Sequence, residues 1–96
     1  MNKLEAREIL EAEIEKYRAM EYRELFRLID SPRNYQVQGP GDREYQLEVQ
    51  AFWDQPRNPG GDLRVIASID DGRFLSALLP LTLDFIMSRE GDFIGE

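Results

Sequence analysis

Glu48 and Asp70 are the two acidic residues of this sequence that could act together as a functional carboxylate pair. The strand pattern described below places them opposite each other on the outer face of a sheet, with Asp71 next in the following turn. Two carboxylates held together can bind a hard cation or keep one proton at a raised pKa. The Asp-Asp-Gly turn is itself a sufficient reason for these aspartates, and no DxDxDG calcium loop is present. The turn explanation is therefore favoured.

The other residues that usually perform catalysis are missing or lack their motifs. The chain contains no histidine and no cysteine, which removes the commonest general base, the commonest metal ligand and every thiolate site. Its serines occur in no GxSxG or SxxK motif, and its glycines lack the strand-to-helix context of a phosphate-binding loop. The sequence therefore predicts a protein that is not an enzyme and that holds no cofactor and no metal.

Length and charge limit the class of protein and of partner. With 96 residues and no long apolar run, the chain is expected to form one domain, residues 1–96, without a membrane span. Its net charge of −7 disfavours nucleic acid as a partner, because phosphate binding requires clustered Lys and Arg. The charge suits a basic protein partner, although solubility is its simplest role. The lack of cysteine and of a signal-peptide region predicts a cytoplasmic protein.

The N-terminal third is predicted to be helical. Asn2 followed by Glu5 resembles a capping box, in which the cap side chain accepts a backbone hydrogen bond at the start of a helix. The apolar stripe that follows breaks near residue 20, which predicts a helix over residues 3–19 and a second piece over residues 21–29. One continuous bent helix is the alternative. Pro32 ends the helical region, because the residue before proline avoids the helical conformation.

Residues 45–53 give the clearest strand signal, because apolar and polar side chains alternate strictly along them. Pairing this strand with the next so that Val49 faces Ile69 brings apolar against apolar on the core face. The same register pairs Phe52 with Ile66, and Glu48 with Asp70, on the outer face. An earlier strand contains Tyr35 and Val37. Asp71-Gly72 predicts a two-residue hairpin turn into a fourth strand over residues 74–79.

These elements predict an α+β fold, with the N-terminal helix, bent or in two pieces, packed on a four-stranded antiparallel meander sheet. The expected divisions are helical residues 1–30, the meander over 33–79, and residues 80–96 with a helical turn at Thr82 and a short C-terminal hairpin. This order resembles the cystatin-like α+β roll. Residues 45–96, through EYQLEVQAFWD, VIASIDDG, PLTLDFIM and GDFIGE, also resemble a set of small bacterial proteins. The resemblance implies the fold and carries over no catalytic residue.

An apolar strip on the outer sheet face is the candidate interface, formed by Phe52, Ile66, Leu75 and Ala77. Exposed strips of this kind mark interaction surfaces, but residues 81–94 could fold back and cover it, and both arrangements remain open. The leading hypothesis is a non-catalytic protein-interaction or homodimerisation domain that acts through this face or an edge strand. The competing hypothesis is a small-ligand-binding module with a pocket between helix and sheet, lined by Tyr17, Tyr22, Tyr35 and Trp53.

Overall fold

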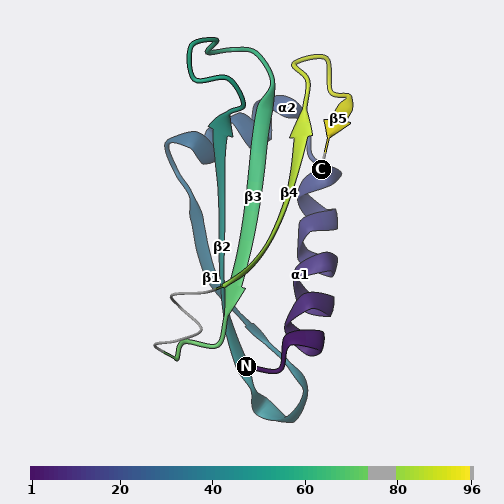
Figure 1. Ribbon diagram of the computed structural model, residues 1–96, viewed down its shortest axis with the longest axis vertical. Helices are drawn as coiled ribbons and strands as arrows, with labels where there is room; N and C mark the ends of the chain where they lie inside the picture. The colour runs from purple at the N-terminus through teal and green to yellow at the C-terminus, as the bar shows by residue number, and fades with distance from the viewer. Residues whose placement is uncertain (74–79, 96) are drawn as a thin grey trace.

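A computed structural model describes residues 1–73 and 80–95 as one helical layer on an antiparallel sheet of five strands in chain order (Figure 1). The strands are β1 (Arg33–Gln38), β2 (Glu44–Trp53), β3 (Leu63–Asp70), β4 (Leu81–Met87) and β5 (Phe93–Gly95). Helix α1 (Lys3–Arg18) lies against β3 and β4. The predicted α+β fold is confirmed, with five strands where four were expected.

The helical region consists of two pieces, as the break in the apolar stripe predicts. The Asn2 side chain accepts a hydrogen bond of 3.1 Å from the backbone N–H of Glu5, so α1 begins at the expected cap. After α1 the chain turns and forms α2 (Tyr22–Phe26) and a short 3₁₀ helix, η1 (Arg27–Ile29). Among the described residues, no helix is long and apolar enough to cross a membrane.

The core lies between α1 and the sheet, and the alternation of β2 sets its inner face. Tyr45, Leu47, Val49 and Ala51 are buried against the helical layer. Trp53, the last residue of this series, is half-buried and packs its ring 5.5 Å from that of Phe26. The predicted assignment of faces is therefore correct along the whole strand.

The predicted register between β2 and β3 is wrong by two residues. Val49 pairs with Ala67, and Ile69 pairs with Leu47. A shift of two residues leaves every side chain on its own face, so the alternation alone cannot distinguish the two registers. The ladder continues to Trp53 and Leu63, and the connecting loop closes with a 2.9 Å hydrogen bond from the Asp54 N–H to the Asp62 carbonyl. In the observed register the connecting loop spans residues 55–61.

Strand β4 pairs with β3, a position that was predicted for residues 74–79. Those residues lie outside the described part of the chain. Val65 pairs with Phe85, and Ile69 pairs with Leu81. The helical turn expected at Thr82 is therefore wrong, because Thr82 lies within this strand. Pro80 stands just before the strand, where its missing N–H interrupts no ladder. The predicted C-terminal hairpin is confirmed as β4–β5.

Candidate functional site

The outer face of the sheet, which points away from α1, does not carry the continuous apolar strip that was predicted. Phe52 is 45% exposed, but it stands opposite Arg64 and not opposite Ile66. Ile66 lies between Gln50 on one side and Asp84 on the other. The remaining predicted interface residues, Leu75 and Ala77, lie outside the described residues. Residues 81–87 do not cover this face, because they form β4 within the sheet.

Arg64 joins two acidic side chains on the outer face, near the start of β3. Its Nε and Nη2 donate to Oδ1 of Asp54 at 3.2 and 3.0 Å, and its Nη1 donates to Oδ2 of Asp84. Asp54 and Arg64 are thus in contact although Arg64 pairs with Phe52 in the β2–β3 ladder. The carboxylates of Asp84 and Asp54 raise the pKa of Arg64. This face therefore presents a fixed ionic cluster of one arginine and two aspartates, with isolated apolar residues around it.

The candidate carboxylate pair is not formed as predicted. Glu48 pairs with Ser68, and Asp70 pairs with Gln46, so the two acids are diagonal neighbours on the outer face. Asp70 accepts a 2.7 Å hydrogen bond from the N–H of Gly72, the role of an aspartate that forms a turn. Among the described residues, no three acidic side chains gather where a metal ion could be held. The turn explanation accounts for Asp70.

Strand β1 is the element that presents the most unpaired backbone N–H and carbonyl groups to a partner. It stands at one edge of the sheet, and no described strand pairs with its outer side. Its six residues pair with β2 without a bulge and include neither lysine nor proline. Short strands, lysine, proline and bulges are the usual protection of a sheet edge against other chains. The edge strand β1 lacks all four.

The turn at the end of β1 determines which of its residues hydrogen-bond to β2 and which direct their backbone groups outward. The N–H of Gly39 donates to the carbonyl of Arg43 at 2.6 Å, so these residues form a hydrogen-bonded pair. Such pairs alternate along an antiparallel ladder, which makes Val37 and Tyr35 the next residues bonded to β2. The residues that alternate with these direct their backbone N–H and carbonyl groups to the open edge; they are Asn34, Gln36 and Gln38. Their exposed amide side chains lie on the outer face.

A tyrosine network fastens the middle of β1 to α1. The Tyr35 hydroxyl donates to Oε1 of the nearly buried Glu13 at 3.0 Å and lies 3.0 Å from the Tyr17 hydroxyl. Burial, with the contacts to Tyr17 and Glu13, raises the pKa of Tyr35. The Arg33 guanidinium stacks 5.7 Å from the Tyr35 ring centroid. The edge strand is therefore held rigidly, which lowers the entropic cost of binding a partner there.

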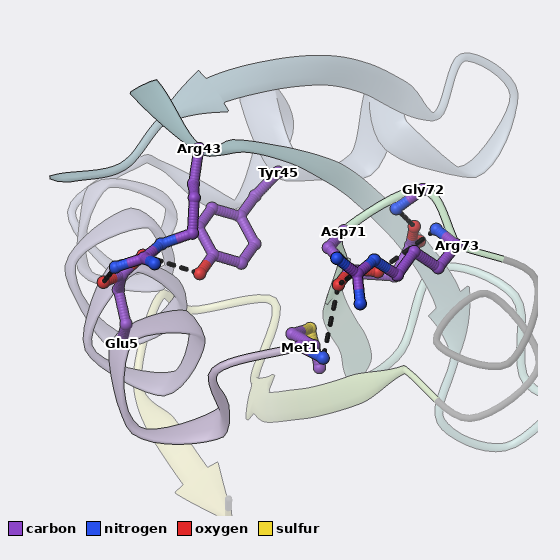
Figure 2. Close-up of polar contacts among 8 residues, drawn as sticks. Met1, Glu5, Arg43, Tyr45, Asp71, Gly72 and Arg73 are labelled. Carbon is purple, nitrogen blue, oxygen red and sulfur yellow. Dashed lines mark hydrogen bonds and ion pairs between the residues drawn. The ribbon is translucent and has the colours of Figure 1, made fainter. Parts of the chain in front are cut away.

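A second cluster fixes the β1–β2 hairpin to the start of α1. Figure 2 shows the Arg43 fork and the Tyr45 hydroxyl meeting the Glu5 carboxylate. Arg43 donates through Nε and Nη2 at 3.0 and 2.9 Å, and Tyr45 donates at 2.7 Å. Gly39 completes the cluster, because a Cβ there would lie 2.8 Å from the Tyr45 ring. These contacts join residues far apart in the sequence, and no sequence motif indicates them.

Replacing Glu5 with glutamine should change how stability depends on pH. Hydrogen bonds from Arg43 and then Tyr45 lower the pKa of Glu5 below its ordinary 4.5. A lowered carboxylate pKa contributes stability that is present above that ordinary value and is lost as the pH falls through the folded-state pKa. In urea titrations, Glu5→Gln should therefore be less stable than wild type at pH 7, with a difference that shrinks below about pH 4.5. Glu11→Gln, which removes only the exposed pair with Arg7, is the control. A constant difference across this range would contradict the assigned role of Glu5.

The four aromatic residues expected to line a pocket do not gather around one cavity. Tyr17 and Tyr35 bond to each other, as described above. Tyr22 donates from its hydroxyl to the Gly61 carbonyl at 2.7 Å, and Trp53 packs on Phe26. These rings fill and fasten the edges of the core, which is what buried tyrosines commonly do.

Comparison with known proteins found no matching family model, no matching curated protein and no matching solved structure. The similarity to a cystatin-like roll therefore stays a prediction. The functional assignment rests on the geometry of the residues described above.

Proposed function

We propose that this chain is a non-catalytic protein-interaction domain that dimerises through the edge strand β1. The observation that carries the proposal is the row of outward N–H and carbonyl groups on Asn34, Gln36 and Gln38, with no lysine, proline or bulge within the strand. Adding a strand to an open sheet edge is a recurrent mode of protein recognition. The lack of histidine and cysteine supports a non-catalytic role in the cytoplasm, and the net charge of −7 disfavours nucleic acid.

When a two-fold axis passes between the Gln36 residues of two copies, their β1 strands pair in a register that bonds every outward N–H and carbonyl group. Gln36 then pairs with the partner's Gln36, and Asn34 pairs with the partner's Gln38. Three such pairs with two bonds each supply about six backbone hydrogen bonds. On the inner face Tyr35 meets the partner's Val37, so apolar contacts apolar. On the outer face amide meets amide, which is the pattern that cross-strand pairing favours.

Charge does not oppose this association, although each copy is strongly acidic. Residues 34–38 carry no charged side chain, and the two Arg33 residues lie at opposite ends of the paired strands. The repulsion between two chains of charge −7 therefore acts over a distance at which salt screens it. Dimerisation should accordingly strengthen as the salt concentration rises.

Cysteine cross-linking tests the register directly. The wild-type chain has no cysteine, so Gln36→Cys introduces a single thiol. At the axis, the two Cα atoms of a hydrogen-bonded pair lie about 5.5 Å apart, within the range that a disulfide spans. Mild oxidation should yield a covalent dimer of Gln36→Cys. The matched control is Gln46→Cys, because Gln46 pairs with Gln36 one strand further in. Equal cross-linking of both variants would contradict the register.

Gln36→Lys tests the dimer without a disulfide. It places two like charges at the axis, and lysine at a sheet edge opposes strand addition. In sedimentation at about 100 μM, wild type should be dimeric and Gln36→Lys monomeric and folded, with Gln46→Lys as the control. A wild type that stays monomeric at millimolar concentration would remove the dimer proposal. Dissociation by Phe52→Glu and not by Gln36→Lys would move the interface to the outer face.

A further inference from the structure

A surface cavity of about 550 Å³ lies between the α1–α2 break and the β4–β5 hairpin. Figure 1 shows these two segments at the same end of the molecule. The cavity size falls within the range of small-molecule sites, roughly 300–1,000 Å³. It stands at the edge of the sheet formed by β5, so it is separate from the proposed dimer interface at β1, the other edge.

Local hydrogen bonds hold both walls of the cavity in place. On the hairpin side, the buried Ser88 accepts at Oγ from the Asp92 N–H at 3.1 Å and donates from its own N–H to the Asp92 carbonyl at 2.8 Å. Gly91 takes a φ of +92°, which glycine adopts without strain. On the helical side, the Tyr22 hydroxyl is bonded to the Gly61 carbonyl. A ligand would therefore meet a largely preformed site.

The base of the cavity is apolar and incompletely covered. Met20, Met87 and Phe93 contribute to its lining. Phe93 is 52% exposed and meets the buried Phe85 ring edge-on, with the centroids 5.7 Å apart. Methionine side chains adapt their shape to irregular groups, and exposed aromatic surface beside a hollow favours an apolar ligand group.

The rim of the cavity carries more basic than acidic residues, in contrast to the chain as a whole. Three arginines and two glutamates line it, and Arg23 pairs with Glu21 at 3.3 Å. Within residues 1–73 and 80–95, Arg89 makes no ion pair with a carboxylate. Burial raises the pKa of Tyr22, and Arg89 opposes that rise more strongly than Asp62 or Glu90 adds to it. The Arg89 guanidinium therefore acts on the Tyr22 side of the cavity.

We propose that this cavity binds a small organic acid, with its carboxylate on Arg89 and its aromatic or branched aliphatic group on Met20, Met87 and Phe93. Charge and shape complementarity select this occupant: one unpaired cation at the rim requires one anionic group, and the apolar base requires a hydrophobic one. A guanidinium binds a carboxylate through two parallel hydrogen bonds, which also orients the ligand.

The probe for this proposal is 4-phenylbutyrate, titrated into the ¹⁵N-labelled wild-type protein while amide chemical shifts are followed. Saturable shifts should gather at residues 20–23 and 87–93, which line both walls. The matched neutral ligand, 4-phenylbutanamide, should bind about tenfold more weakly. Tenfold corresponds to about 1.4 kcal/mol, close to the contribution of one hydrogen bond to a charged group. Equal affinity for the two ligands, saturable shifts elsewhere, or no saturable shift would overturn the proposal.

Arg89→Gln provides the test on the protein side. Arg89 is exposed, so the variant should fold normally and lose about tenfold in affinity for 4-phenylbutyrate while its affinity for the neutral amide stays unchanged. Arg73→Gln is the matched control, since Arg73 follows the end of β3 that is opposite to the Leu63–Met87 pair and does not line the cavity. Unchanged binding to Arg89→Gln, or an equal loss in Arg73→Gln, would show that the carboxylate does not sit on Arg89.

Discussion

Replacing Val49 with aspartate should unfold the protein. Val49 is 0% exposed, at the middle of β2 and in the core between the sheet and the helical layer. A buried carboxylate without a partner costs about 3–5 kcal/mol, and the lost valine burial costs about 1.5–3 kcal/mol more. The sum is comparable with the entire stability of a small domain, roughly 5–15 kcal/mol. Far-UV circular dichroism at 25 °C should show a largely unfolded chain.

The control for Val49→Asp is Gln50→Asp, which places the same side chain one residue along β2. Gln50 lies on the outer face, where water reaches it, so this variant should keep a melting temperature close to that of wild type. The two variants introduce the same side chain, aspartate, on the inner and on the outer face of β2. A Val49→Asp protein that melts like Gln50→Asp would show that the inner face of β2 is not the core.

Phe85→Ala should cost about 3–5 kcal/mol, the usual loss when a buried phenylalanine is truncated to alanine. Phe85 is 0% exposed and pairs with Val65 in the centre of the sheet. Its ring contacts Phe93, and the Arg18 guanidinium stacks 5.7 Å from its centroid, so truncation removes these contacts as well. Urea titration measures the loss as a lower midpoint with little change in slope.

Phe52→Ala is the matched control, because Phe52 is 45% exposed on the outer face and should lose much less on truncation. Equal losses in the two variants would mean that β4 is peripheral. The comparison therefore tests the largest difference between the predicted and observed sheets.

The sequence predicts which face of the sheet a side chain occupies better than it predicts which residue stands opposite on the next strand. Alternation along residues 45–53 identifies the buried side of β2 because successive side chains point to opposite faces. It cannot fix which residue of β3 stands opposite Val49, because a shift of two residues preserves both faces. For the same reason, Phe52 and Ile66 were predicted as a pair although Arg64 stands opposite Phe52.

Two other features could not be read from side-chain patterns. The alternation Leu81, Leu83, Phe85 marks β4, but Pro80 and Thr82 also suit the start of a helix, and only the β3 ladder decides between them. The hydrogen-bonded pair Gly39–Arg43 determines which backbone groups of β1 point to the open edge. Side-chain type carries no information about it.

The meander order has a consequence for filament growth. In a sheet whose strands follow chain order, the two edges are its first and last strands, here β1 and β5. Pairing β1 with the partner's β1 is isologous and closes at two copies, whereas pairing β1 with a neighbour's β5 would be head-to-tail and could extend without limit. β5 spans three residues and β1 spans six, so a head-to-tail ladder would leave half of β1 unpaired. The unequal lengths of the two edges therefore favour a closed dimer over a fibre.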